Sequence, residues 1–118
     1  MTDDDPSVTD PELYQVLFEN ERVRVLRYRD EPGDRTHPHR HPDSVMVTLS
    51  SFQRRVAVGD RSAEIALPAG EARWLGAQEH TGENIGDSAT HCVFVELKEP
   101  APASASITGP PPLGPSAS

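Results

Sequence analysis

The 118-residue sequence contains few of the residue types on which several classes of protein depend. Its single cysteine, Cys92, excludes an intrachain disulfide framework and a cysteine-rich zinc module. Eleven basic residues against nineteen acidic ones argue against a basic surface of the kind that binds nucleic acid. Six aromatic residues limit the size of the core, and twelve prolines with eight glycines argue against a helical bundle.

Long hydrophobic stretches are missing as well. The longest apolar runs fall far short of the ~20 residues that span a bilayer. The acidic residues Asp3–Asp5 stand where a signal peptide would be basic, and no apolar segment follows them. We therefore expect a cytoplasmic protein with neither a membrane nor a nucleic acid as its partner.

Composition divides the chain into three segments. Residues 1–12 carry five acids and no base, whereas residues 99–118 carry one acid and are rich in Pro, Ala and Ser. The net charge of −8 therefore resides mainly in the N-terminal segment, and residues 13–98 are close to charge balance. We predict a single folded domain at 13–98, between an acidic N-terminal tail and a disordered C-terminal tail.

The central segment shows the alternation of apolar and polar residues that is typical of strands. Val93 and Val95 share one parity, for example, while Cys92 and Phe94 share the other. Short β-rich runs separated by Pro-Gly and Gly-Asp turns predict an all-β sandwich or barrel. We expect strands near 14–20, 22–31, 44–52, 54–58, 62–67, 71–76, 79–85 and 90–98.

One local pattern conflicts with this prediction. Asp10-Pro11-Glu12 is typical of a helix start, and Leu13, Val16 and Leu17 follow at helical spacing. A helix there would have at most two turns, because Asn20 and the alternation after it end the pattern.

The histidines are the most informative residues. His37, His39 and His41 occur within five positions, and His80 lies much farther along the chain. Alternate residues of an extended chain point the same way, so His39 and His41 can present two imidazoles to one point. A third imidazole from another strand would complete a facial set around a divalent metal and leave coordination positions open. The spacing alone does not decide whether His80 reaches that point.

These histidines belong to two glycine-containing patterns. Gly33 is followed by five residues and then by His39-Arg40-His41, and Pro68-Ala69-Gly70 precedes His80-Thr81-Gly82-Glu83-Asn84. The two patterns, in this order, resemble the two motifs of the cupin superfamily of small β-barrels. The resemblance covers roughly residues 14–98 and implies a single-domain jelly roll, also called a double-stranded β-helix.

Two further stretches resemble a subgroup of short, single-domain bacterial cupins. They are the segment His39–Asp43 and the ending Val95–Lys98. One member of that subgroup is associated with β-alanine degradation, but the resemblance supplies no established reaction. Small single-domain cupins often form dimers, so the resemblance is also compatible with a homodimer.

The chain departs from the first cupin motif at its acidic residue. The motif has three or four residues between its second histidine and a Glu, and Val45 and Met46 stand at these two positions instead. No Glu occurs between Glu31 and Glu64. The familiar site of three histidines and one glutamate is therefore not available.

Three alternatives follow for the metal. His39, His41 and His80 resemble the three-histidine centres of some cupin dioxygenases that lack the Glu, and we favour this reading. Asp43 would be a substitute carboxylate, although it lies only two residues from His41 and follows a proline. Alternatively, the barrel has lost its metal.

Four other residues have two interpretations each. His91 is an acid–base candidate if the Val93 face of its strand lines the cavity, and otherwise it is structural or exposed. His37 is more simply an exposed loop residue than a fourth ligand. Trp74 belongs either to the pocket or, more simply, to the core. For Cys92 we expect a buried, inert thiol.

Two classes of function remain open. The first is a metal-dependent enzyme acting on a small organic molecule: a dioxygenase with Fe²⁺, which we favour, or a Lewis-acid isomerase or lyase with Zn²⁺, Ni²⁺ or Mn²⁺. The second is a non-catalytic module that binds a small-molecule ligand, because a fold does not fix a function.

Overall fold

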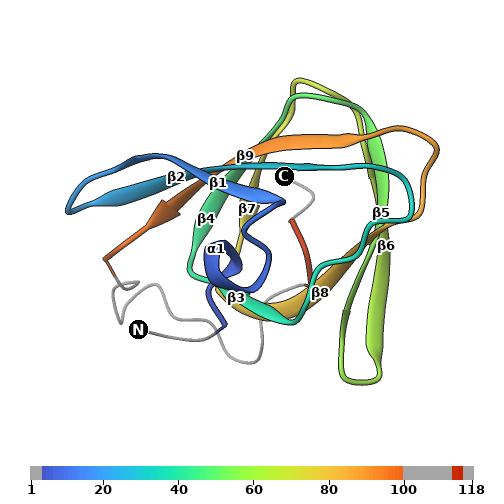
Figure 1. Ribbon diagram of the computed structural model, residues 1–118, viewed down its shortest axis with the longest axis horizontal. Coiled ribbons are helices and arrows are strands. Elements are labelled where there is room, and N and C mark those ends of the chain that lie inside the picture. The colour runs from blue at the N-terminus through green and yellow to red at the C-terminus, as the bar shows by residue number, and fades with distance from the viewer. Residues whose placement is uncertain (1–3, 100–112, 116–118) are drawn as a thin grey trace.

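A computed structural model describes residues 4–99 and 113–115. In that part of the chain one short helix precedes nine strands (Figure 1). The elements are α1 (Pro6–Thr9), β1 (Tyr14–Glu19), β2 (Val23–Asp30), β3 (His39–His41), β4 (Ser44–Thr48), β5 (Phe52–Val58), β6 (Arg61–Leu67), β7 (Ala72–Leu75), β8 (Gln78–Asn84) and β9 (Thr90–Leu97). The all-β architecture that the sequence predicts is confirmed.

The strands form two antiparallel sheets around a common core. One sheet has the order β1-β2-β9-β4-β7 and the other has the order β3-β8-β5-β6. From β2 onward the chain passes repeatedly from one sheet to the other, which is the connectivity of a jelly roll. The buried hydrophobic cluster consists of Tyr14, Leu26, Tyr28, Met46, Phe52, Leu75, Cys92 and Phe94.

All eight strands expected from the sequence are present, with shifted ends, and the described residues contain a ninth. Alternation does not reveal β3, because it has only three residues and lies between Pro38 and Pro42. Its existence depends on antiparallel pairing with β8. The strand expected at 44–52 ends at Thr48, and Phe52 already belongs to β5.

The helix expected after Asp10 is wrong. Residues from Tyr14 onward form β1, which pairs with β2 on both sides of an irregularity at Leu17, so tertiary pairing outweighs the local helical spacing. Asp10 does not start a helix: it is the C-cap of α1, and its buried carboxylate accepts the backbone N–H of His37. The helix of the described residues is α1, which Asp5 caps by accepting the N–H of Ser7 at 2.9 Å.

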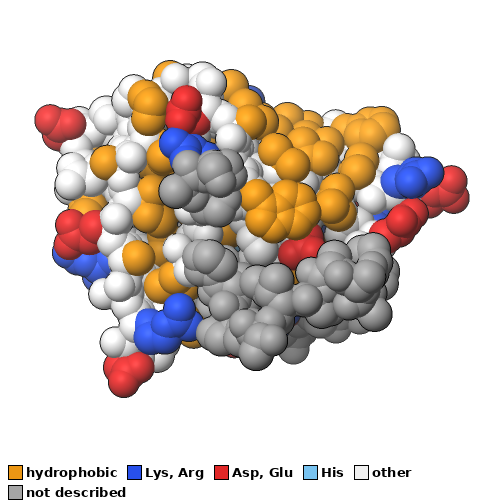
Figure 2. Space-filling view, turned by 180° about the vertical axis from the view of Figure 1, so that it is seen from behind, with side chains coloured by type: hydrophobic (Ala, Val, Ile, Leu, Met, Phe, Trp, Pro, Cys, Tyr) orange, Lys and Arg blue, Asp and Glu red, His pale blue; other side chains and the backbone are white. Residues whose placement is uncertain are grey.

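The outer face of the five-stranded sheet is apolar. Val25, Val95, Val45 and Trp74 stand opposite one another across β2, β9, β4 and β7. Figure 2 shows hydrophobic side chains gathered on the back of the molecule. Trp74 is 42% exposed, so the expectation that it lies in the pocket or in the core is wrong.

The two terminal segments are described in part. Residues 4–12 contain α1, which packs against β1 and β3. Of residues 99–118 the structure describes Glu99 and the stretch 113–115, and the rest of the expected tail lies outside the described residues. No helix in the described part of the chain has the length and hydrophobicity needed to cross a membrane.

Candidate metal centre

Strand pairing brings the three predicted histidines together. β3 runs antiparallel to β8 with His39 opposite His80, and His41 follows two residues later on the same face of β3. One potential ligand atom from each imidazole lies within 4.8 Å of the others. His39 is 0% exposed, His41 1% and His80 8%, so the group is buried inside the barrel.

Each of these imidazoles is held on its Nδ1 side by an oxygen of the protein. The contacts are His39 Nδ1 to the carbonyl of His37 at 2.9 Å, His80 Nδ1 to Gln78 Oε1 at 2.8 Å and His41 Nδ1 to Glu96 Oε2 at 3.3 Å. Because an oxygen of this kind can only accept a hydrogen bond, each Nδ1 is the donor and each Nε2 keeps its lone pair. Histidines that bind metals are held in this way.

The electrostatics keep the imidazoles neutral. Burial lowers the pKa of His39 below its ordinary value, and it lowers the pKa of His41 and His80 well below theirs. Repulsion from the neighbouring imidazoles adds to the effect at His41 and His80. All three rings are therefore unprotonated at neutral pH, which is the form that coordinates a metal.

One unsatisfied atom of this group fits a divalent metal ion. Nε2 of His39 is buried and has no hydrogen-bond partner among the described residues. An orphaned buried acceptor costs about 1–3 kcal/mol, and coordination of a metal would remove that cost. Among the described residues, the group whose ligand atoms could hold a metal ion is His39, His41 and His80, and it includes no carboxylate.

Two carboxylates, those of Asp43 and Glu96, have contacts other than with a metal site. Asp43, the substitute considered from the sequence, accepts the N–H of Ala77 at 2.8 Å and does not join the histidines. Glu96 is 2% exposed and lies between His41 and Arg24, whose Nε donates to Oε1 at 2.9 Å. Sequence reasoning missed Glu96, although the parity that it shares with Cys92 and Phe94 was visible.

The histidines face a small cavity with mainly apolar walls. Its volume is about 40 Å³, and its walls include Tyr14, Met46, Phe52 and Phe94. Met46 occupies the inward position close to where the cupin motif has its Glu, while Val45 points outward.

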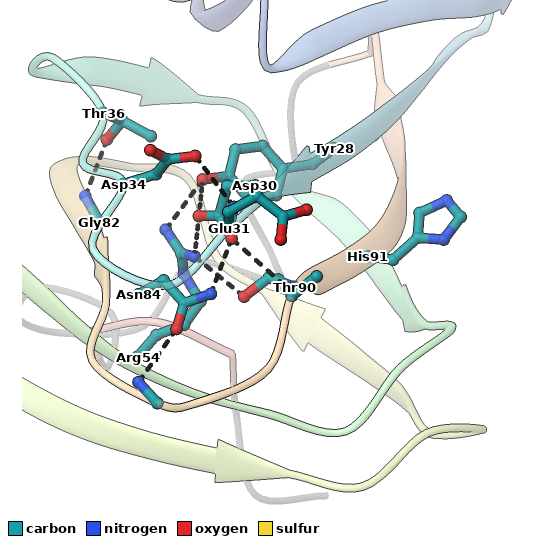
Figure 3. Close-up of polar contacts among 12 residues, drawn as sticks. Tyr28, Asp30, Glu31, Asp34, Thr36, Arg54, Gly82, Asn84, Thr90 and His91 are labelled. Atoms are coloured by element: carbon teal, nitrogen blue, oxygen red, sulfur yellow. Dashed lines mark hydrogen bonds and ion pairs between the residues drawn. The ribbon is translucent and has the colours of Figure 1, made fainter.

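A buried polar network forms another part of the cavity wall (Figure 3). Asp30 accepts hydrogen bonds from the Tyr28 hydroxyl, from Arg54 Nη1 and from Asn84 Nδ2. Arg54 also donates to Thr90 Oγ1 at 3.1 Å and to the Tyr28 hydroxyl at 3.1 Å. Sequence reasoning missed this network, and the available signal was the parity that Arg54 shares with Val56 on β5.

Two of the remaining candidates, His91 and His37, lie outside the cavity. The acid–base role of His91 required the Val93 face of β9 to line the cavity, but the opposite face of the strand, with Cys92, is buried there. Figure 3 shows His91 pointing away from the buried network. The side chain of His37 is 73% exposed and contacts Asp10. Cys92 is buried as expected, and burial raises the pKa of its thiol to about 12.

Similar proteins are found by comparison of structures. No protein-family model matches the chain, and no curated protein is significantly similar in sequence. A cupin domain from Bordetella pertussis has a TM-score of 0.69 at 29% identity, over 74% of this chain and 93% of that one.

Two further solved structures show the same fold at lower identity. A conserved protein with a double-stranded β-helix domain from Klebsiella pneumoniae has a TM-score of 0.58 at 22% identity, over 72% of this chain and 75% of that one. A polyketide cyclase from Streptomyces resistomycificus has a TM-score of 0.54 at 18% identity, over 75% of this chain and 66% of that one.

Proposed function

The chain belongs to the cupin superfamily, and from that premise we propose that it is a metal-dependent cupin enzyme that acts on a small organic molecule. His39, His41 and His80 would hold one divalent ion through Nε2. The observation that carries the proposal is their common arrangement: three buried, neutral imidazoles, each with its Nδ1 engaged by an oxygen.

The donor set defines the chemistry that this ion would supply. Three neutral imidazoles leave the full +2 charge of the ion, so it would act as a Lewis acid, and Fe²⁺ would in addition supply the redox step of a dioxygenase. We favour Fe²⁺ and dioxygenase activity. With Zn²⁺, Ni²⁺ or Mn²⁺ the same site would support isomerase or lyase chemistry.

The chain's own residues favour an anionic substrate. Arg54 places its guanidinium in the wall of the cavity that contains the histidines. Met46 and Phe94 supply apolar surface beside them and exclude water from the bound molecule. An enolate or a carboxylate would therefore bind between the positive charge of the metal and the donors of Arg54.

Metal content tests this proposal directly. Protein purified without added metal should contain about one metal ion per chain. The double variant His39→Ala/His41→Ala should contain less than about a tenth, because removal of two of three ligands destroys the site. Inductively coupled plasma mass spectrometry gives both values. The His91→Ala variant is the matched control, because His91 is not in the cluster, and it should keep its metal.

Reconstitution and turnover complete the test. Wild-type protein that stays empty after addition of Fe²⁺, Zn²⁺, Ni²⁺ and Mn²⁺ would overturn the proposal. For an iron-loaded sample, oxygen uptake with β-diketones, thiols and hydroxyaromatic compounds measures the dioxygenase reaction. A metal-bound protein without oxygen uptake would favour the Lewis-acid reactions, which isomerisation and elimination assays on the same compounds measure.

A further inference from the structure

A short piece of the C-terminal segment returns to the barrel and lies against the cavity. Gly114 is buried, and its N–H donates to Gln78 Oε1 on β8 at 2.7 Å. Gly114 and Pro115 both line the cavity that contains the three histidines. Figure 1 shows this piece, in red, beside β8. The contact therefore joins residues 113–115 to the wall that carries His80.

The backbone conformation at this position favours a glycine. Gly114 has a φ of +76°, a backbone conformation that residues with a side chain rarely adopt. A Cβ at this position would lie 2.5 Å from Cδ1 of Ile65 on β6 and 3.8 Å from Cγ2 of Val56 on β5. The backbone of Gly114 thus packs against side chains of the four-stranded sheet, and a larger residue would have to displace the end of the Ile65 side chain.

The side chain of Gln78 connects Gly114 to the candidate metal ligand His80. Gln78 Oε1 accepts both the N–H of Gly114 and the Nδ1–H of His80, at 2.7 and 2.8 Å. With residues 113–115 in place the cavity measures about 40 Å³. Pockets for small organic ligands measure about 300–1,000 Å³, so the remaining space holds only a few water molecules.

We propose that the barrel mouth formed by β5, β6 and β8 is a peptide-binding site whose occupant is Leu113–Pro115 of this chain. Its ligand is a short segment with a backbone N–H donor and a glycine in the left-handed conformation, followed by proline. In this state the segment closes the cavity, and a small organic molecule reaches the histidines only after it leaves. The importance of that closure for catalysis rests on the proposed function, but the closure itself does not.

The accessibility of His80 in the metal-free, full-length chain tests the proposal. Diethylpyrocarbonate modifies accessible neutral imidazoles, and mass spectrometry gives the rate at each histidine. His37, whose side chain is 73% exposed, serves as the internal reference. The Gly114→Val variant cannot adopt the bound conformation, so we expect the ratio of the His80 rate to the His37 rate to rise several-fold.

A control variant and a shortened protein test whether the effect comes from residues 113–115. Gly59, in the turn between β5 and β6, also has a positive φ, but a Cβ there meets nothing within 4 Å. The Gly59→Val variant therefore reproduces the backbone strain without touching the mouth and should leave the ratio unchanged. A chain that ends at Glu99 retains all nine strands and should show the same rise as Gly114→Val.

An unchanged ratio in both Gly114→Val and the shortened chain would overturn the proposal. Because the experiment uses metal-free protein, this result is independent of metal content. A protein that binds metal but shows no change in His80 accessibility would retain the proposed function and lose the closure. A protein that binds no metal, but whose His80 becomes accessible in the variants, would retain the closure and lose the proposed function.

Discussion

At the scale of single residues, the candidate centre depends on oxygens that hold the imidazoles as much as on the imidazoles themselves. Glu96 illustrates this point, because its carboxylate contacts Nδ1 of His41 from a position 55 residues away in the chain. The sequence predicts that Glu96 shares a parity with Cys92 and Phe94. It does not reveal the contact, since no local pattern relates β9 to β3.

We predict that Glu96→Gln weakens metal binding while the fold persists. An amide oxygen can still accept the Nδ1–H of His41, but the loss of negative charge makes the imidazole a poorer donor to the metal. The dissociation constant for Zn²⁺ should rise about tenfold, the lower end of the effect of such residues. Competition with a chromophoric chelator measures it.

Glu83→Gln provides the control for that measurement. Glu83 also lies on a strand of the barrel, but its carboxylate contacts Arg35 and Arg55 rather than a histidine. This variant should bind Zn²⁺ like the wild type. Equal dissociation constants for Glu96→Gln and Glu83→Gln would show that Glu96 does not tune the site.

At the scale of elements, the N-terminal residues show how tertiary pairing decides between two local patterns. The segment from Leu13 to Leu17 fits both a helix and a strand, and its ladder with β2 selects the strand. The helix forms earlier, at α1, where Asp5 provides the cap. Asp5 also pairs with Arg24 Nη2 at 3.0 Å, which ties α1 to β2.

The charge of Asp5 should make the attachment of α1 dependent on pH. Burial by itself raises the pKa of Asp5, but hydrogen bonds from Arg24 and Ser7 outweigh it and hold the pKa below the ordinary 3.8. The carboxylate therefore contributes stability above pH 3.8, and this contribution is lost as the pH falls through the lower, folded-state pKa.

Asp5→Asn isolates this contribution, because asparagine is an equally good helix cap and lacks only the charge. At pH 7 the variant should lose about 0.5–1 kcal/mol of unfolding free energy, a value suited to a partly exposed, screened pair. The difference from wild type should disappear in acid. Urea unfolding at several pH values measures both. Asp60→Asn, at the exposed β5–β6 turn, is the control, and a difference that persists at low pH would contradict the assignment.

At the scale of the whole molecule, one buried carboxylate joins the two sheets. Asp30 ends β2 in the five-stranded sheet and binds Arg54 of β5 and Asn84 of β8 in the four-stranded sheet. It also accepts the backbone N–H of Thr90 at the start of β9. The closure of the barrel at this end is therefore polar, whereas the apolar cluster fills its centre.

We predict that Asp30→Asn destabilises the entire fold, because it leaves the buried guanidinium of Arg54 without its counter-charge. Breaking a buried pair in this way costs about 3–5 kcal/mol, which equilibrium urea unfolding will detect. Glu64→Gln, which removes the exposed pair with Arg55, should cost no more than about 1 kcal/mol. Equal losses in the two variants would show that the network does not join the sheets.

The sequence by itself determined the features that local periodicity encodes. Alternation predicts eight of the strands, and the period of two places His39 and His41 on one side of an extended chain. The two motifs identify His80 as their companion. These features are local because backbone geometry sets the direction of neighbouring side chains.

Only the tertiary structure decided which side of each strand faces the cavity and which residues meet there. Alternation defines the two faces of β9, but the packing of the sheets buries Cys92 rather than His91. The pairing of β3 with β8 places His39 opposite His80, and the same packing brings Arg54 and Gly114 to the cavity. Such contacts depend on register and on the approach of two sheets, which join residues far apart in sequence and leave no periodic trace in it.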